Sequence, residues 1–310
     1  MAAKASRQSF GEAIARIGET NPNVMVMDAD LGKSTMTGAF AKKFPDRYLE
    51  FGIAEHNMIG TAAGLSLAGK IPFAASFACF LTGRYETIRI SACYSNANVK
   101  LVGTHAGIGI GEDGNSQMGL EDIAVLRSLP NFVILQPGDD IETQKAVEWS
   151  AQHMGSVYLR LTRQKLPDVH GTDYQFNMGK GDVLKNSANT ELAIFATGGV
   201  LYNALQAAQE LEKEGLSATV VNFHTIKPID EALIKEMASR HKQILTIEDH
   251  NIIGGLGSAV SEVLSELGLP VRLTRHGVSA FGESGDPEGL YEKYGFSTPK
   301  IKTLVKQLVK

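Results

Sequence analysis

The sequence predicts an α/β protein made of two α/β domains whose sheets are mostly parallel. The chain has 310 residues, which fits two domains of about 150 residues each. Short apolar runs alternate with longer helix-like stretches in both halves, as parallel strands joined by crossover helices require. Hydrophobic residues make up 43% and charged residues 21% of the chain, which excludes a disordered or fibrous protein.

The first domain is predicted to span residues 1–178. Its apolar runs predict five strands, at 24–27, 71–75, 99–102, 132–135 and 157–161. The stretches between them predict helices at 54–67, 83–94, 120–127 and 140–154. Before the last helix, Pro137-Gly138-Asp139-Asp140 offers a turn and an N-cap.

The second domain is predicted to span residues 179–310. The pattern weakens from Asn177 through a polar turn at 186–190, and the alternation of strands and helices then begins again. Strands are expected at 192–196, 218–222, 243–248 and 271–275, with helices at 201–214, 230–241 and 256–267. Gly254-Gly255-Leu256-Gly257 follows a strand and opens a helix. A lone glycine turn is a weak phosphate signal, so we interpret it as structural and expect this domain to serve assembly.

Composition narrows the possible partners and location. The formal net charge of -4 shows no excess of Lys and Arg, so we expect neither a nucleic-acid nor a membrane partner. The chain has two cysteines, Cys79 and Cys93, too few for disulfide bonds to stabilise a chain of this size. This favours a reducing cytoplasmic setting. No signal peptide and no run of about 18 apolar residues is apparent.

Two short segments carry the most chemical information. Glu55 lies at the start of an apolar, Ala- and Gly-rich helix, where it could face a cofactor or be a helix-start acid favoured by the macrodipole. Phe77 and Phe80 are three residues apart, where both rings could meet a flat heterocycle or simply pack in the core.

Together with Asp28-Ala29-Asp30-Leu31 and Gly109-Ile110-Gly111-Glu112-Asp113-Gly114, these residues resemble the pyrimidine-binding domain of transketolases. The resemblance extends nearly end to end, because the second half resembles the transketolase C-terminal domain. It implies thiamine diphosphate as a cofactor, with Mg²⁺. It also implies transfer of a two-carbon ketol unit from a phosphorylated or otherwise anionic ketose to an aldose.

The resemblance assigns cofactor-binding roles to four positions. Glu55 would be the catalytic carboxylate that hydrogen-bonds N1′ of the aminopyrimidine. Phe77 and Phe80 would form the aromatic wall around that ring, and Asp30 would lie near the thiazolium. Gly83 occupies the place where transketolases commonly have a third aromatic residue, so the wall is expected to be thinner here.

The resemblance also assigns the substrate end of the site. Arg7, Ser34, His105 and Arg163 match the residues that grip the terminal phosphate of the sugar, and their side chains suit a tetrahedral oxyanion. Asp113 matches a hydroxyl-binding aspartate. Gln117 stands where transketolases carry a His. Because Gln cannot titrate near pH 7, the identity of the donor is in doubt, and a modified sugar is an open hypothesis.

The cofactor's diphosphate and Mg²⁺ should be held elsewhere. Family members bind them through Gly-Asp-Gly and a later Asn, since a metal that bridges phosphates needs oxygen ligands. This chain contains no such pair, and we predict no metal ligand in it. We therefore expect a partner chain, an N-terminal transketolase subunit that carries Gly-Asp-Gly…Asn, and a two-plus-two (α2β2) heterotetramer.

Two other readings remain. The β subunit of a 2-oxo acid dehydrogenase E1 component shares both domains, the glutamate and a divided chain, but it has no need for a sugar-phosphate clamp. A non-catalytic homologue that keeps the fold would be expected to lose Glu55 or the clamp first, and both are present.

Overall fold

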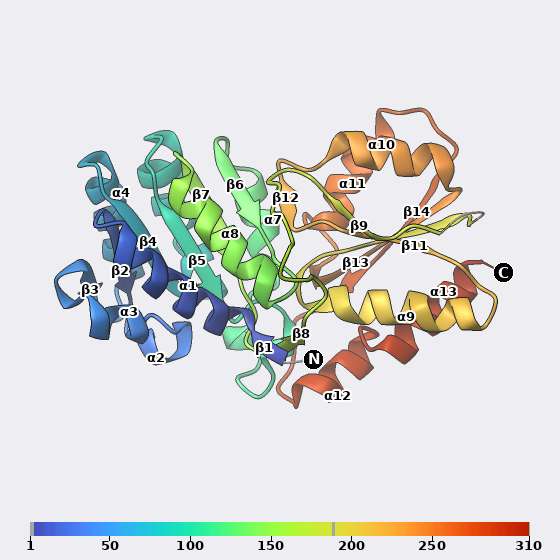
Figure 1. Cartoon of the computed structure of the whole chain (residues 1–310), viewed down its shortest axis with the longest axis horizontal. Coiled ribbons are helices and arrows are strands. Elements are labelled where there is room, and N and C mark those ends of the chain that lie inside the picture. The colour runs from blue at the N-terminus through green and yellow to red at the C-terminus, as the bar shows by residue number, and fades with distance from the viewer. Residues whose placement is uncertain (1–2, 188–189, 310) are drawn as a thin grey trace.

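The computed structural model describes residues 3–187 and 190–309 as two α/β units side by side (Figure 1). Each unit is built on one sheet with helices on both faces, and most strands within each sheet run parallel to one another. The predicted fold class is therefore confirmed. Residues 188–189 of the predicted polar turn lie outside the described residues.

The first unit is built on a seven-stranded sheet in the order β12-β6-β7-β5-β4-β2-β3. All strands except β12 are parallel and come from the first half of the chain: β2 (Val24–Asp28), β3 (Tyr48–Glu50), β4 (Ile71–Phe77), β5 (Lys100–Thr104), β6 (Phe132–Leu135) and β7 (Ser156–Arg160). The five predicted strands are present, and β3 is an addition. Parallel strands are covered on both faces, which explains their almost continuous apolar runs.

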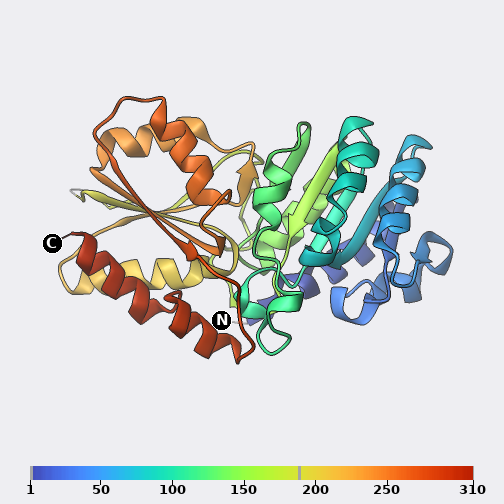
Figure 2. The same cartoon turned by 180° about the vertical axis from the view of Figure 1, so that it is seen from behind.

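Helices cover both faces of this sheet, as the front and rear views show (Figures 1 and 2). One face packs against α1 (Ser6–Thr20), α3 (Gly38–Lys43) and α8 (Asp140–Gln152). The other packs against α4 (Glu55–Leu67), α7 (Asp122–Arg127) and the turn of π-helix at Ile88–Tyr94. Asp139 caps α8 as predicted, since its side chain accepts a hydrogen bond from Glu142 N at 2.8 Å.

The helix predicted at 83–94 is interrupted. α5 (Ala78–Thr82) ends at Gly83, and a short α6 (Tyr85–Thr87) then passes into the π-helical turn. Ser95 N bonds to Ile90 O and Ala97 N bonds to Ala92 O, so each hydrogen bond spans five residues. Sequence periodicity near 3.6 cannot identify such a widened turn.

The second unit has a five-stranded sheet in the order β14-β13-β10-β11-β9. Its strands are β9 (Asp182–Lys185), β10 (Leu192–Ala196), β11 (Thr219–Asn222), β13 (Gln243–Asn251) and β14 (Arg272–Val278). Only β9 is antiparallel. The helices α10 (Glu231–Arg240) and α11 (Leu256–Ser265) lie above the sheet in Figure 1, with α9 (Leu201–Lys213), α12 (Pro287–Tyr294) and α13 (Thr298–Leu308) below it. All predicted strands and helices of this half are present.

The two units share structure. β12 (Thr225–Lys227) belongs to the second half of the chain but pairs antiparallel with β6 in the first sheet. One apolar core also runs through both units, from Met58 on α4 to Val260 on α11. The division of the chain at residue 178 therefore stays a prediction.

A buried charge cluster ties the connecting segment to both units. His170 Nδ1 lies 2.8 Å from Asp139 Oδ2, and its Nε2 lies 3.1 Å from Asp182 Oδ2 on β9. Tyr174 Oη donates to Glu142 Oε1 at 2.8 Å in the same cluster. Although burial lowers the pKa of His170, the hydrogen bonds with Asp139 and Asp182 outweigh it and raise that pKa to about 10.

Replacing His170 with Gln should lower the free energy of unfolding by about 3 kcal/mol below roughly pH 6.5, because the Asp139 carboxylate loses a buried cationic partner. The folded-state pKa of His170 is raised, so its contribution is complete below the unfolded value of about 6.5 and is lost as pH rises through 10. Urea unfolding across this range measures the effect, with exposed His56→Gln as the control. Equal differences between wild type and His170→Gln at both ends of the range would contradict the assignment.

Candidate active site

The predicted site residues gather at one edge of the first sheet. Carboxyl ends of parallel strands meet at the same edge, which is where ligands bind in such folds. Asp30 and Ser34 follow β2, Glu55 follows β3, Phe77 and Phe80 lie at and after the end of β4, His105, Asp113 and Gln117 follow β5, and Arg163 follows β7. Arg7, at the start of α1, reaches the same edge.

Glu55 is the first residue of α4 and is 3% exposed. Its Oε2 lies 3.3 Å from the guanidinium of Arg84, whose side chain is partly open to solvent. The sequence prediction did not include Arg84. Its position directly after Gly83, the C-cap of α5, brings it to Glu55. A buried carboxylate at a helix start with a partly exposed cationic partner can exchange that partner for a ligand.

The aromatic pair forms a stack. The rings of Phe77 and Phe80 are nearly parallel, with centroids 5.4 Å apart and an interplanar angle of 10°. The opposite side of Phe77 stacks on the His105 ring at 3.7 Å. Phe77 is therefore fixed between two rings, whereas half-buried Phe80 has only this one aromatic partner among the described residues. Phe80 offers the free surface for a flat ring.

Three of the predicted anion-binding residues meet directly. Arg7 Nη1 donates to Ser34 O at 2.8 Å and lies 3.2 Å from His105 Nε2. His105 Nδ1 lies 2.9 Å from Thr104 Oγ1. Since Arg7 can only donate, His105 Nε2 accepts and the imidazole proton lies on Nδ1. His105 thus orients Arg7, and Ser34 contacts Arg7 through its carbonyl oxygen.

Electrostatics fit this assignment. Burial, followed by the charges of Arg7 and Arg163, lowers the pKa of His105 to about 3. Burial also lowers the pKa of Arg7, with the Arg163 charge next in effect, while the Asp113 charge raises it. The two guanidiniums thus act on the same imidazole and on each other, so a bound anion would relieve repulsion between them.

Arg163 reaches this region from the segment after β7. Its Nη1 donates to the Ile110 carbonyl and to Glu112 Oε2, the latter at 2.9 Å, and lies 3.9 Å from Asp113 Oδ2. The structure does not join Arg163 to Arg7 by a hydrogen bond within the described residues. The predicted four-residue clamp is therefore a close trio of Arg7, Ser34 and His105 with Arg163 beside it, held by Glu112.

Asp30 and Gln117 lie at the same edge without hydrogen bonds to the other predicted residues in the described part of the chain. Asp30 has a left-handed backbone (φ 62°), and its amide donates to Glu50 Oε1 at 2.7 Å. Gln117 ends a short 3-10 turn, Asn115–Gln117, beside α5. Cofactor and substrate roles for all ten residues remain predictions.

The buried carboxylate of Asp28 organises the loop that carries Asp30 and Ser34. It accepts hydrogen bonds from Leu31 N at 2.6 Å, Thr35 Oγ1 at 2.5 Å and Thr37 Oγ1 at 3.0 Å. Sequence reasoning did not assign this role. The available signal was an Asp at a strand end followed by two threonines within ten residues.

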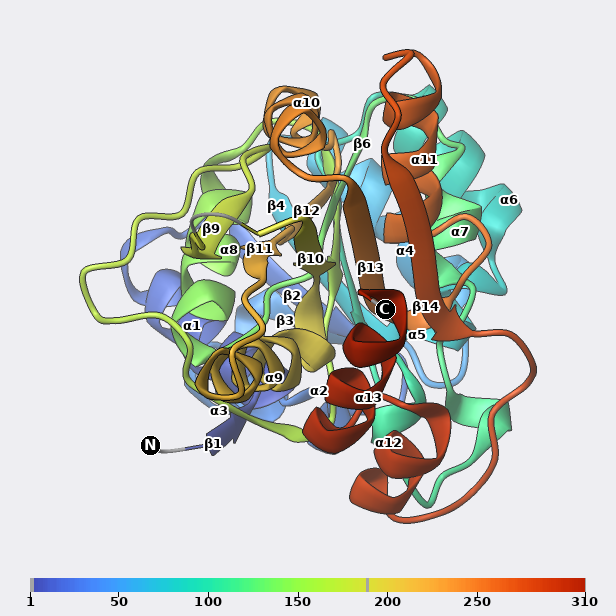
Figure 3. The ribbon, with the colours of Figure 1, turned by 90° about the vertical axis from the view of Figure 1, so that its right-hand side faces the viewer.

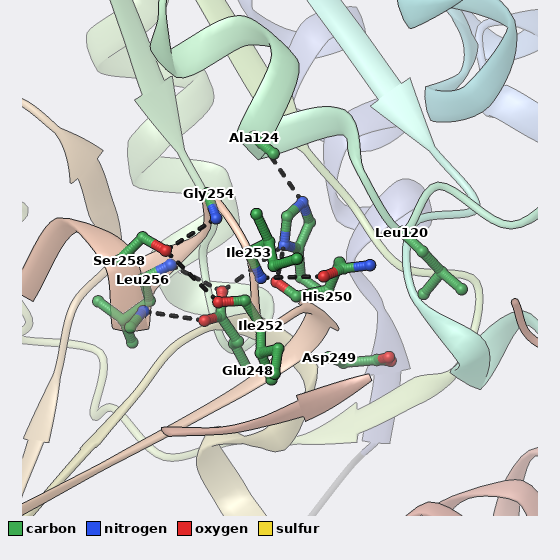
Figure 4. Close-up of polar contacts among 12 residues, drawn as sticks. Leu120, Ala124, Glu248, Asp249, His250, Ile252, Ile253, Gly254, Leu256 and Ser258 are labelled. Atoms are coloured by element: carbon green, nitrogen blue, oxygen red, sulfur yellow. Dashed lines mark hydrogen bonds and ion pairs between the residues drawn. The ribbon is translucent and has the colours of Figure 1, made fainter. Parts of the chain in front are cut away.

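The glycine turn of the second unit is structural, as predicted. Buried Glu248 accepts hydrogen bonds from Leu256 N and Gly257 N, at 2.7 and 2.8 Å, at the start of α11 (Figure 4). Burial raises the pKa of this carboxyl to about 7. The protein's own side chain occupies the place that a phosphate would need.

Residues 3–187 and 190–309 contain no group of three or more His, Cys, Asp or Glu side chains placed to hold a metal ion. Across the same ranges, no helix combines the length and apolar character needed to cross a bilayer.

Known protein families match the chain over most of its length. Residues 2–169 match the family model of the transketolase pyrimidine binding domain, and residues 179–301 match that of the transketolase C-terminal domain. The chain belongs to the transketolase family. Within it, the chain corresponds to the C-terminal subunit of a split transketolase.

Individual relatives support that placement. A transketolase C-terminal section of Methanocaldococcus jannaschii is 42% identical over 99% of this chain and 97% of its own length. A solved split gene transketolase, described as an inactive β4 tetramer, is 43% identical with a TM-score of 0.89, covering 99% of this chain and 98% of that one. Rat transketolase is 38% identical over 98% of this chain. The chain spans about half of that relative, since the match covers 49% of the rat protein.

The neutral state of His105 is testable on the isolated chain. Histidine ring signals in NMR should show no titration of His105 between about pH 5 and 8. Arg163→Gln should raise its pKa, yet leave it below the ordinary 6.5, because burial is the largest cause of the shift. Arg16→Gln, on the same helix as Arg7 but paired with Glu148, is the control. Titration of wild-type His105 near pH 6.5 would contradict this electrostatic picture.

Proposed function

We propose that this chain is the pyrimidine-binding subunit of a two-chain transketolase. It would transfer a two-carbon ketol unit from a phosphorylated or otherwise anionic ketose to an aldose. The observation that carries the proposal is the convergence of buried Glu55, the Phe77–Phe80 stack and the Arg7–His105 pair at one sheet edge. A proton carrier, a ring platform and an anion site together fit this chemistry better than any one of them alone.

The residues present fit thiamine diphosphate. When bound, this cofactor supplies a carbon nucleophile for the ketose carbonyl. Glu55 would hold a proton at N1′ of the aminopyrimidine, from a position that is shielded from water and forms an ion pair with Arg84. Phe80 would support the ring, and Phe77 would keep Phe80 in place. Asp30 would lie toward the thiazolium end.

The substrate's anionic end would bind between Arg7 and Arg163. Two guanidiniums provide paired donors for phosphate oxygens, and neutral His105 keeps Arg7 oriented toward them. Asp113 would accept a hydrogen bond from a sugar hydroxyl. Gln117 would donate to or accept from a hydroxyl or carbonyl without moving a proton, so the reaction's proton transfers would fall to other groups.

Diphosphate and Mg²⁺ would be held by an N-terminal subunit with Gly-Asp-Gly and a later Asn, since this sequence has no such pair. The similar split-gene structure is described as an inactive β4 tetramer. We propose likewise that this chain alone lacks activity and that the active form is an α2β2 heterotetramer.

The other readings have less support. A 2-oxo acid dehydrogenase β subunit does not explain why Arg7 and Arg163 both act on His105, and the relatives at 38–42% identity are transketolases. A non-catalytic homologue does not explain why Glu55 is buried at the same edge as the anion site.

Glu55→Gln tests the proposal in the complex with the N-terminal subunit. Loss of the proton carrier should lower ketol transfer by roughly 10²–10⁴-fold, while folding is retained because Arg84 can turn to solvent. Coupled assays with a phosphorylated ketose donor measure this, and exposed Glu86→Gln is the matched control. Near wild-type turnover of Glu55→Gln would refute the assignment. Carbon dioxide release from a 2-oxo acid without ketol transfer would establish the dehydrogenase reading instead.

A further inference from the structure

The loop after β5 is embedded in the second unit. Its apolar residues Ile108, Ile110, Met118 and Leu120 are at most 3% exposed and belong to the core formed by β10, β13, α9, α12 and α13. In the side view this loop lies beside α12 (Figure 3). The same loop carries His105, Asp113 and Gln117 to the candidate active site.

A single carboxylate of the second unit binds the backbone of this loop. Asp249, on β13, accepts hydrogen bonds from Ile108 N at 2.8 Å and Gly109 N at 3.3 Å. Tyr291 Oη, on α12, donates to the same carboxylate at 2.9 Å. Asp249 is 1% exposed, so these donors replace water around its charge.

The loop has a backbone shape that admits the carboxylate. Gly107 has φ +89°, and a Cβ at this position would lie 2.2 Å from Asp249 Oδ2. Only glycine combines this conformation with the close approach. Gly107 follows His105 by two residues, so the anchoring point is adjacent to the ring that orients Arg7.

The far end of the loop is tied to the same place. Arg160 Nη2 donates to Gly119 O at 2.8 Å and to the Asp249 carbonyl at 3.0 Å. The amide of Asn251 donates to Leu120 O at 2.7 Å, so a second residue of β13 also holds the loop. Between the two ends, Gly282 N bonds to Asn115 Oδ1 and Ser284 Oγ bonds to Glu112 O.

We propose that Asp249 is a positioning residue: it anchors the loop 105–119 from the second unit and thereby places His105, Asp113 and Gln117 for the substrate. This inference rests on the proposed function for its kinetic consequence, and on the contacts alone for the anchoring. It gives the second unit a part in substrate binding beyond assembly.

Asp249→Asn is the direct test. The variant keeps the side chain's shape, but its NH₂ group cannot accept, so either Ile108 N or the pair Gly109 N and Tyr291 Oη loses its acceptor. Hydrogen exchange of peptides covering 105–119 in the isolated chain should accelerate about tenfold, with β10 and β13 unchanged. In the complex with the N-terminal subunit, KM for a phosphorylated ketose should rise about tenfold and kcat should change less than about threefold.

Glu248→Gln is the matched control. Glu248 neighbours Asp249 on the same strand and also accepts from two backbone amides, but those belong to α11. In the Glu248→Gln variant, hydrogen exchange of peptides 105–119 and KM for the phosphorylated ketose should remain at wild-type values. Tyr291→Phe keeps the carboxylate's bonds to the loop and should show a smaller change of the same kind, which preserves the test if Asp249→Asn does not fold.

Unchanged exchange in 105–119 for Asp249→Asn would overturn the proposal. Acceleration throughout the second unit, with lower kcat and unchanged KM, would overturn it as well, because a purely structural residue behaves that way. A selectively loosened loop in a chain whose wild-type complex shows no ketol transfer would support the anchoring and overturn only the proposed function.

Discussion

The arrangement of the two units depends on one buried ion pair. Arg160 and Asp122, 1% and 0% exposed, meet at 2.8 Å between the end of β7 and the start of α7. The same guanidinium binds the carbonyls of Gly119 and Asp249. Removing one member of such a pair leaves an uncompensated charge in the interior, whereas the intact pair adds little net stability. We interpret the role of this pair as specificity, since Arg160 Nε binds Asp122 while Nη2 binds a carbonyl of the loop and a carbonyl of the second unit.

The position of the candidate site follows from how the strands and this loop are arranged. The parallel strands of the first sheet present their carboxyl ends at one edge, and the loop fixed by Arg160 and Asp249 closes one side of it. Glu55 and Arg84, Phe77 and Phe80, and Arg7 and His105 form three neighbouring pairs. Each pair holds a group that a ligand can use. We propose that the chain presents part of a site and that a partner subunit completes it.

Sequence reasoning succeeded where local pattern decides structure. The strands at 132–135 and 192–196 have the predicted bounds because long apolar runs between turns leave no other choice. Three-residue β3 and β12 are too short to show periodicity, and β12 pairs across the two units. The helices α1, α12 and α13 lie outside the predicted elements, although α13 has apolar residues at helical spacing, Ile301 and Val305.

The residues of the candidate site also differ in how far the sequence could identify them. Glu55 and Phe77 could be named because they lie in short informative segments, and the anion-binding residues because their positions match those of the family. Arg84 and Asp249 could not, since their partners are fixed by folding; Asp249 and Ile108 are 141 residues apart in sequence. We propose that this chain supplies the proton carrier and the anion site while a partner holds the cofactor's diphosphate. The measurement that tests it is ketol transfer by the purified chain, by the N-terminal subunit and by their mixture, each with thiamine diphosphate and Mg²⁺. We expect turnover only in the mixture, and full activity of the chain alone would contradict the account.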